Sequence, residues 1–135
     1  NGCFMLGLPG DNENSIAKTV TFAKQLNPDT AQFYPLMVYP GTGSYSWAKE
    51  KGYLKTEDFS KWLDLKGRHA TTINYPDLTN EKLGELCDTA RMKFYLRSDY
   101  LTYKIRQSLT SPSEALRTLK AAKTFFRYLA NNIFS

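Results

Sequence analysis

The first thirteen residues constrain the fold more than any other part of the chain, because they join a strand, a glycine turn and a helix start. Residues 2–8 are continuously apolar, which is typical of a parallel strand covered on both faces. The Gly-Leu-Pro-Gly turn at 7–10 breaks this run, and Asp11 and Asn12 favour a helix N-terminus. A domain rarely begins inside a central strand, so we expect the chain to be a piece of a longer protein.

A helix and a second strand are predicted next. Asn27-Pro28 ends the helix, since the residue before a proline disfavours the helical region. Residues 30–39 are rich in aromatic and β-branched residues and predict the second strand, with Pro35 placing it at the edge of its sheet. The chain thus begins with one right-handed β-α-β unit. The apolar positions that recur at helical spacing in the helix are Ile16, Val20, Ala23 and Leu26.

The remainder is predicted to be helical, over 44–51, for a turn or two within 57–65, from Thr79 to Phe94 and from Pro112 onward. Ser111-Pro112-Ser113-Glu114 reads as a capping box with proline at the first helical position. The expected buried positions are Leu83, Leu86, Cys87, Ala90 and Phe94 in one helix and Ala115, Leu119, Ala122, Phe126 and Leu129 in the other. The fold class is therefore α/β, divided into a β-α-β part, residues 1–55, and a helical extension, residues 56–135.

The net charge of +5 is concentrated in the last third of the chain. Residues 91–135 carry nine Lys or Arg against two acidic residues, whereas residues 1–90 carry nine against eleven. One interpretation is that these cations only form the solvent-exposed faces of helices. The other is a surface for an anionic partner, either nucleic acid or membrane headgroups.

No complete catalytic site can be built from the residues themselves. The lone His69 has no cysteine or carboxylate at ligand spacing, so we assign it no role. Cys3 and Cys87 read as small core residues, and two thiols alone predict a reducing cytoplasm and hold no iron–sulfur cluster. No Gly-Lys-Ser/Thr follows the turn at 7–10, so it is not a phosphate loop. We therefore assign no catalytic residue and no metal ligand.

Several blocks together carry a resemblance to a known family. They are GCFMLGLPGD at residues 2–11, FAKQLNPDTAQF at 22–33, YPGT at 39–42, AKEKGYL at 48–54 and FYLR at 94–97. Their order and spacing resemble the C-terminal half of radical S-adenosylmethionine (SAM) enzymes, especially the class with an N-terminal cobalamin-binding domain. The resemblance covers nearly the whole chain and is weakest over residues 56–77.

The resemblance implies a six-stranded partial barrel of the TIM type, of which this chain supplies the last two strands. In the family, the carboxyl ends of these strands help to form the pocket for the adenine of SAM. The family's glycine motif on the first of these strands is matched with one extra residue, and Asp11 stands where glutamate is usual. The positions that correspond to the pocket are Phe4, Leu6, Gly7, Leu8, Leu36, Val38, Tyr39 and Pro40.

The resemblance also implies cofactors that this chain does not hold by itself. The family binds SAM and a [4Fe–4S] cluster, and many members bind cobalamin. The Cys-x-x-x-Cys-x-x-Cys motif that ligates the cluster is not in this sequence. We therefore expect a fragment of a cytoplasmic radical SAM oxidoreductase or methyltransferase that alone binds no cluster and turns over no substrate.

Three kinds of partner are expected. The first is the remainder of the parent enzyme, and the second is another copy of the fragment, paired through the open strand edge at Asn1. The third is an anionic partner for the basic tail. In the rival interpretation the chain is a basic interaction module, because Phe125-Phe126-Arg127-Tyr128-Leu129 lies beside cations, as in helices that bind membrane surfaces.

Overall fold

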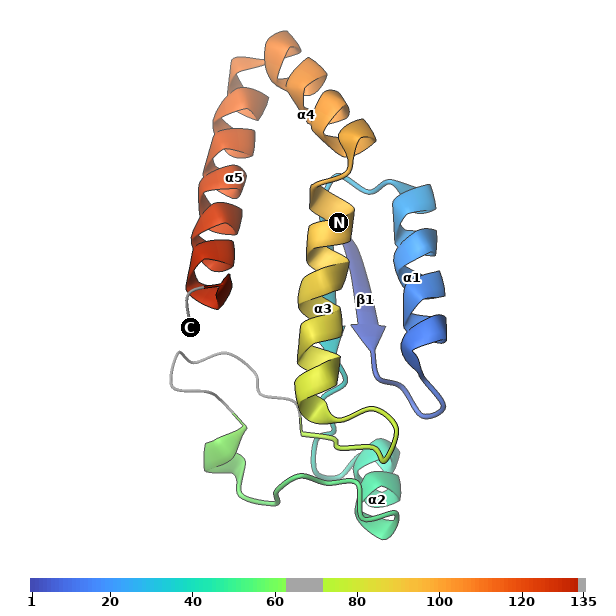
Figure 1. Cartoon of the computed structure of the whole chain (residues 1–135). Helices are drawn as coiled ribbons and strands as arrows, with labels where there is room; N and C mark the ends of the chain where they lie inside the picture. Colours follow the sequence, from blue (N-terminus) through green and yellow to red (C-terminus); the bar gives the residue numbers. More distant parts are fainter. Residues whose placement is uncertain (63–71, 134–135) are drawn as a thin grey trace. The chain divides into compact units, whose positions relative to one another are not determined.

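The computed structural model describes residues 1–62 and 72–133, which fall into two compact units, Asn1–Phe94 and Tyr95–Ser135. Each unit is described by itself. The described residues contain two parallel strands, five α-helices and one short 3-10 helix, so the chain is α/β as predicted (Figure 1). In chain order these are β1 (Gly2–Leu6), α1 (Glu13–Leu26), β2 (Ala31–Pro35), α2 (Gly43–Glu50), the 3-10 helix (Phe59–Lys61), α3 (Asn80–Tyr95), α4 (Ser98–Thr110) and α5 (Pro112–Ile133).

The predicted β-α-β unit is present, with β1 and β2 paired in parallel from Gly2 opposite Ala31 to Leu6 opposite Pro35. Pro35 has no N–H to donate. The amide of Leu36 instead donates a hydrogen bond to the carbonyl of Leu6 at 2.8 Å. Strand β2 is shorter than the predicted range of 30–39 because the chain leaves the ladder soon after the proline.

Helix α1 begins and ends where its sequence predicts. The side chain of Asn12 accepts from the amides of Asn14 and Ser15, each at 3.0 Å, and Ser15 Oγ accepts from the Asn12 amide at 3.0 Å. These bonds form a capping box that satisfies N–H groups left free at a helix start. At the other end Asn27 takes a left-handed conformation with φ of 45°.

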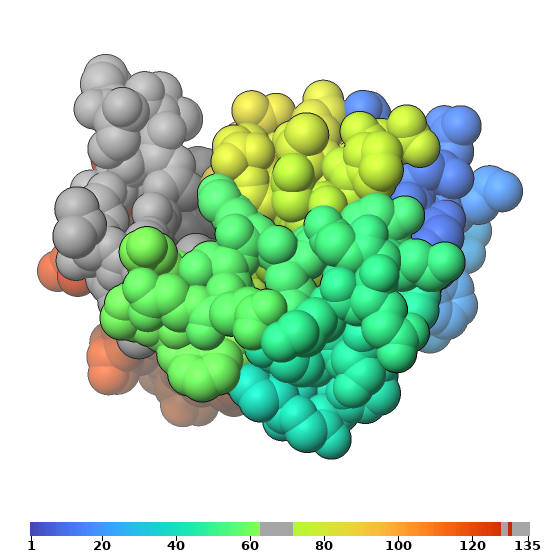
Figure 2. Space-filling model, turned by 90° about the horizontal axis from the view of Figure 1, so that it is seen from below, coloured from blue at the N-terminus to red at the C-terminus, as the bar shows by residue number. Residues whose placement is uncertain are grey.

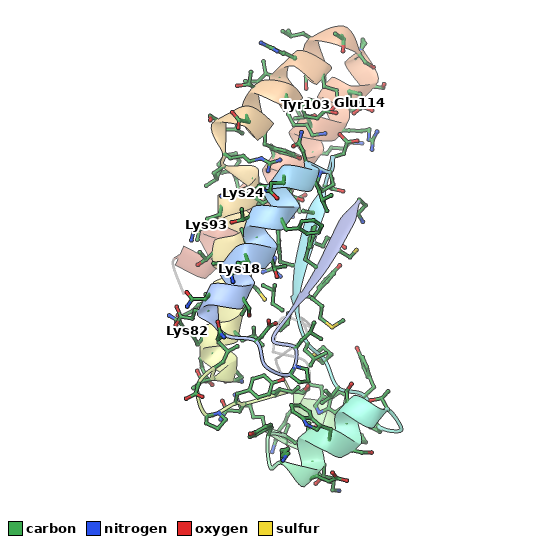
Figure 3. All side chains as sticks on the ribbon, turned by 90° about the vertical axis from the view of Figure 1, so that its right-hand side faces the viewer. Lys18, Lys24, Lys82, Lys93, Tyr103 and Glu114 are labelled. Atoms are coloured by element: carbon green, nitrogen blue, oxygen red, sulfur yellow. The ribbon has the colours of Figure 1, made fainter. Side chains whose placement is uncertain are left out.

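The sheet is covered on one face only, which corrects the expectation of a strand buried on both faces. Phe4 and Leu6 of β1 alternate with the exposed Cys3 and Met5, because successive side chains of a strand point to opposite faces. Figure 3 shows α1 and α3 on the same side of the strands, with the other side open. The expectation that Cys3 is a core residue is therefore wrong for this chain. On β2, Ala31 and Phe33 are buried, whereas Gln32 and Tyr34 are exposed.

A second apolar cluster lies beyond the carboxyl end of the sheet. Leu36 and Val38, which follow β2, are buried with Ala48 of α2 and with Ile73. Figure 2 views the first unit from this end and shows α2 and the segment after it, in teal and green, beside the yellow residues around the start of α3. The chain thus packs its own residues against this end of the strands. Partly buried aromatic and aliphatic side chains surround the cluster: Tyr45, Trp47, Tyr53, Leu54 and Tyr75.

Helix α3 confirms most of its predicted buried face. Leu83, Cys87, Ala90 and Phe94 are each at most 1% exposed, and Leu86 is half-buried. Arg91 lies on the same helix and donates to the carbonyl of Phe33 at 2.5 Å, which ties α3 to β2. The first compact unit runs to Phe94, so the division that we expect near residue 55 lies inside it and stays a prediction.

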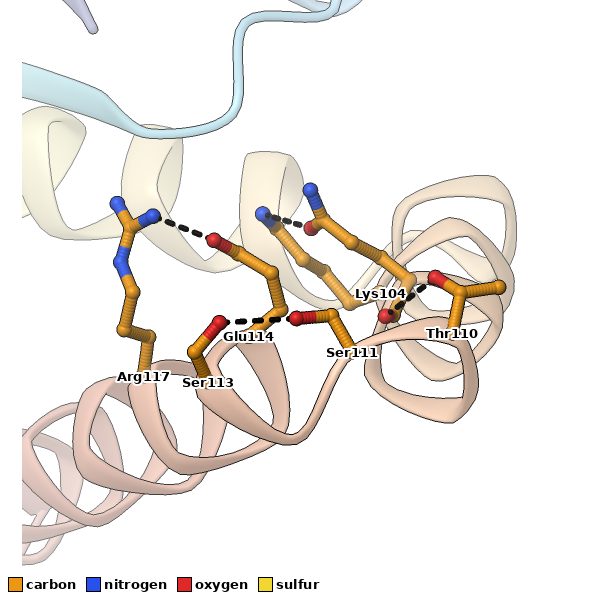
Figure 4. Close-up of polar contacts among 7 residues, drawn as sticks. Lys104, Thr110, Ser111, Ser113, Glu114 and Arg117 are labelled. Atoms are coloured by element: carbon orange, nitrogen blue, oxygen red, sulfur yellow. Dashed lines mark hydrogen bonds and ion pairs between the residues drawn. The ribbon is translucent and has the colours of Figure 1, made fainter.

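The second unit is a pair of helices, α4 and α5, of which α4 was not predicted. Within α4, the Lys104 ammonium donates to the Gln107 side chain at 2.9 Å, and where α5 begins, Ser111 Oγ lies 2.8 Å from Ser113 Oγ (Figure 4). Pro112 is the first residue of α5, as predicted, whereas Glu114 pairs with Arg117 at 2.6 Å rather than with the helix start.

The predicted buried stripe of α5 is wrong at two positions, because Leu119 and Phe126 are 67% and 61% exposed. Ala115 and Ala122 are half-buried, and the side chain of Leu129 lies outside the described residues. Among the described helices, none has the length and apolar character needed to cross a membrane.

Candidate functional site

The turn after β1 is closed by a carboxylate of the chain itself. The amides of Gly7 and Leu8 both donate to Asp11 Oδ2 at 2.9 Å, and Ser15 Oγ donates to Asp11 Oδ1 at 2.6 Å. Two adjacent N–H groups of this kind are what a glycine loop offers to a phosphate. Because Asp11 already occupies them, this turn does not serve as an anion site, in agreement with the exclusion of a phosphate loop.

Gly7 is held from two further directions. The hydroxyl of Tyr75 donates to the carbonyl of Gly7 at 2.8 Å. Burial, helped by the negative charge of Asp11, raises the pKa of Tyr75 to about 12, so this hydroxyl stays protonated as a donor at neutral pH. Gly7 has φ of +84°, and a Cβ placed on it would lie 2.5 Å from Leu83 Cδ2. Only glycine fits this position without strain.

The eight residues predicted to line an adenine pocket divide into buried and accessible ones. Leu6, Gly7, Leu36 and Val38 are buried in the core. Phe4 is half-buried and stacks on Phe33 with 5.2 Å between ring centroids. The three exposed members are Leu8, Tyr39 and Pro40, with Leu8 46% and Tyr39 50% exposed. That the eight residues line a pocket stays a prediction. The three exposed members are the ones that a ligand can reach most directly.

The open face of the sheet presents a second group, which we call the open-face residues: Cys3, Met5, Gln32 and Tyr34. In the parallel register Cys3 is opposite Gln32, and Met5 is opposite Tyr34. The Cys3 thiol lies 3.8 Å from Gln32 Oε1, and the Tyr34 hydroxyl donates to the same oxygen. Sequence reasoning missed this group because it selected Phe4 and Leu6, which alternate with these positions and lie on the covered face.

Aromatic side chains gather near Tyr39, past the end of β2. Its ring lies 5.8 Å from that of Trp62, which in turn lies 4.9 Å from the ring of Phe59. Trp62 is only 8% exposed, whereas Tyr39 and Phe59 are half exposed or more. Together with Leu8, these residues offer apolar and aromatic surface at the end of the strands where α/β proteins bind ligands.

The described residues do not provide a metal site. Over residues 1–62 and 72–133, no group of three or more His, Cys, Asp or Glu side chains is arranged to hold a metal ion. Cys3 is exposed on β1, and Cys87 is buried in α3. His69, to which no role was assigned, lies outside the described residues. A [4Fe–4S] cluster therefore does not fit the residues described here.

The two cysteines are expected to react at very different rates. Burial raises the pKa of the Cys87 thiol to about 11, so about one thiol in a thousand is ionised near pH 8. Cys3 is exposed and accessible to reagent. Iodoacetamide should therefore label one thiol per folded chain and two in denaturant, as counted by mass spectrometry. The Cys3→Ser variant should stay unlabelled until it unfolds, and rapid labelling of that folded variant would contradict the burial of Cys87.

A groove of about 440 Å³ runs between α1 and α3 on the helix side of the first unit. Lys18, Lys24, Lys82 and Lys93 project on this side in Figure 3. Of these lysines, Lys24 and Lys93 line the groove. Glu13 lines it as well and lies 3.6 Å from Lys82, so the groove mixes both charges. The groove is separated from the open-face residues by the sheet, and no catalytic grouping lies in it among the described residues.

Comparison with known proteins gives one informative similarity. No family model and no solved structure matches the chain. The chain is 30% identical over 100 residues to an uncharacterized methyltransferase from Pyrococcus horikoshii, a match that covers 74% of this chain. The match covers 21% of that relative, so the chain spans about a fifth of its length. Over most of its residues, the chain is thus similar to part of a methyltransferase.

Proposed function

We propose that the chain is the C-terminal part of a SAM-dependent methyltransferase of the radical SAM class, in which it forms the last two strands of a partial barrel. The similarity to a methyltransferase supports the reaction class. The observation that carries the rest is the one-sided sheet, with α1 and α3 on one face and the open-face residues on the other.

A β/α barrel places its helices outside and directs the opposite face of each strand toward its interior. In the proposed barrel, α1 and α3 lie outside, and the open-face residues line the chamber. Leu8 and Tyr39 then lie at the carboxyl end of the strands, where barrel enzymes bind their ligands. Met5 and Tyr34, which are 50% and 43% exposed, supply apolar and aromatic surface for an adenine ring or for the substrate.

This chain's contribution is to bind and orient SAM rather than to carry out the chemistry. Its open face suits the adenine of SAM, because it combines a tyrosine ring, a thioether and one amide side chain. The cluster that the radical SAM class requires does not fit the described residues, and neither cluster nor cobalamin ligands are assigned to them. We therefore place both groups with residues of the parent enzyme outside this chain and expect no turnover by the chain alone.

The proposal predicts that a charge on the open face blocks SAM binding by the whole protein. Met5→Arg introduces a cation where the proposed chamber is apolar, and a cation without a partner loses solvation when ligand covers it. We expect the Kd for SAM, measured by equilibrium dialysis, to rise by at least about tenfold. Met5→Gln, which adds no charge, should have a smaller effect.

Gln25→Arg is the matched control, because Gln25 is exposed on α1 and the change adds the same charge on the outer side. It should leave the Kd for SAM unchanged. Thermal unfolding of all three variants separates loss of binding from loss of fold. Equal Kd values for Met5→Arg and Gln25→Arg in folded proteins would contradict the placement of SAM on the open face.

A further inference from the structure

Helix α5 exposes a stripe of large apolar side chains. Leu116, Leu119 and Phe126 are 55%, 67% and 61% exposed. At 3.6 residues per turn, spacings of three and seven residues place these side chains on one side of the helix, within about a quarter of its circumference. Exposed apolar side chains that line up in this way differ from the scattered ones common on monomeric proteins.

This stripe is not the side of α5 that packs inside the second unit. Among the described side chains of α5, the half-buried ones are those of Glu114, Ala115, Thr118, Ala122 and Phe125. Phe125 packs on Tyr95 with 5.3 Å between ring centroids. Helix α4 has a stripe of its own at spacings of four, with Leu101, Ile105 and Leu109 exposed by 46%, 62% and 82%. Both helices of the pair therefore keep apolar surface beyond the surface they use on each other.

Cations adjoin the α5 stripe on one side, and at 3.6 residues per turn Lys123 lies within its arc. Lys120, Lys123 and Arg127 are exposed on the same helix, and Arg117 is 76% exposed even though it pairs with Glu114. Residues 95–135 contain seven Lys or Arg against only Asp99 and Glu114. Long basic side chains can lay their stems along an apolar surface while their charges reach outward, which suits a helix lying at an interface.

The combination favours a lipid surface over nucleic acid. Phosphate contacts to DNA or RNA need cations but gain little from a row of leucines. An anionic bilayer matches both features, because acyl chains accept the apolar stripe while headgroup phosphates attract the cations. A helix that lies in the interface does not need the apolar length of a spanning helix, and no described helix has that length.

We propose that α5 binds the surface of anionic lipid membranes, with Leu116, Leu119 and Phe126 inserted among the lipids and Lys120, Lys123 and Arg127 at the headgroups. This function is independent of the proposed SAM chemistry, because it resides in the second unit and requires neither the sheet nor any cofactor.

The test is sedimentation of the 135-residue chain with vesicles of phosphatidylcholine containing about one third phosphatidylglycerol. We expect binding to these vesicles, much weaker binding to pure phosphatidylcholine, and weaker binding at about 0.5 M salt. Leu119→Gln with Phe126→Gln should weaken binding at least about 100-fold, because two large apolar side chains no longer insert. Lys120→Gln with Lys123→Gln should weaken it about 30-fold, since each cation near the surface contributes about fivefold.

Lys18→Gln with Lys51→Gln is the matched control, because it removes the same charge from exposed positions of the first unit. Its binding should stay within about twofold of the unchanged chain, since both lysines belong to the first unit and not to the proposed lipid-binding helix. Circular dichroism confirms that each variant keeps its helices. Equal binding to neutral and anionic vesicles, or unchanged binding by the Leu119 and Phe126 variant, overturns the proposal. Salt-sensitive binding to a short RNA without vesicle binding assigns the surface to nucleic acid and also overturns it.

Discussion

Replacing Gly7 with alanine should destabilise the chain by about 2–5 kcal/mol in urea unfolding. Two costs add at this position. A side chain at φ of +84° strains the backbone, and its Cβ would lie 2.5 Å from Leu83 Cδ2, in a core where Leu83 is fully buried. Leu83 cannot move aside cheaply, because close-packed interiors have few voids to accept it.

Gly10 provides the matched control, because it shares the backbone strain without the crowding. Its φ is +87°, and no atom lies within 4 Å of the place where a Cβ would stand. Gly10→Ala should therefore cost only about 1–2 kcal/mol. Leu83→Ala should relieve the crowding, so that Gly7→Ala costs about as much as Gly10→Ala in that background. Equal effects of the two glycine changes in the unmodified chain would contradict the packing of Leu83 against the turn.

Truncating Phe33 should have the other large effect, a loss of about 3–5 kcal/mol for Phe33→Ala. Phe33 is fully buried at the centre of the covered face of the sheet. Its ring lies 5.2 Å from that of Phe4 and 6.1 Å from that of Phe94, so truncation removes contacts to both β1 and α3. The loss is measured as the change in the free energy of unfolding in urea.

Tyr34, the next residue, is the control for the sidedness of the sheet. It is 43% exposed on the open face, and Tyr34→Ala should cost less than about 1 kcal/mol. In the whole protein, we expect Tyr34→Ala to weaken SAM binding more than Phe33→Ala does, which is the reverse of their effects on stability. Similar losses of stability for Phe33→Ala and Tyr34→Ala would show that both faces are covered, and the proposed chamber would then have no open face.

Elements with strong local signals could be predicted from the sequence. Helix α1 begins after Asn12 and ends at Asn27 because a side-chain cap and a proline act within a few residues of the backbone they affect. Pro112 marks the start of α5 for the same reason. The parallel pairing of β1 and β2 followed from a strand, a helix and a strand in close succession.

Features that depend on distant residues could not be predicted in this way. The run from Gly2 to Leu8 has no polar residue to mark an exposed side, so only the placement of α1 and α3 reveals that Cys3 and Met5 are open. Helix α4 lacked a strong signal, since Arg97 makes no side-chain cap and Tyr, Thr and Ile favour strands. Leu119 was predicted to be buried but is exposed, so apolar residues at helical spacing predict the helix but not whether another element covers that face.

Photoaffinity labelling of the whole protein tests the proposed SAM chamber most directly. An azidoadenine analogue of SAM, bound and irradiated, should label peptides from residues 1–10 and 32–42, which contain the open-face residues and the exposed Leu8 and Tyr39. Excess SAM should suppress the labelling, and mass spectrometry locates the modified residues. Saturable labelling confined to the outer sides of α1 and α3, or absent from this chain while the protein still binds SAM, would contradict the proposal.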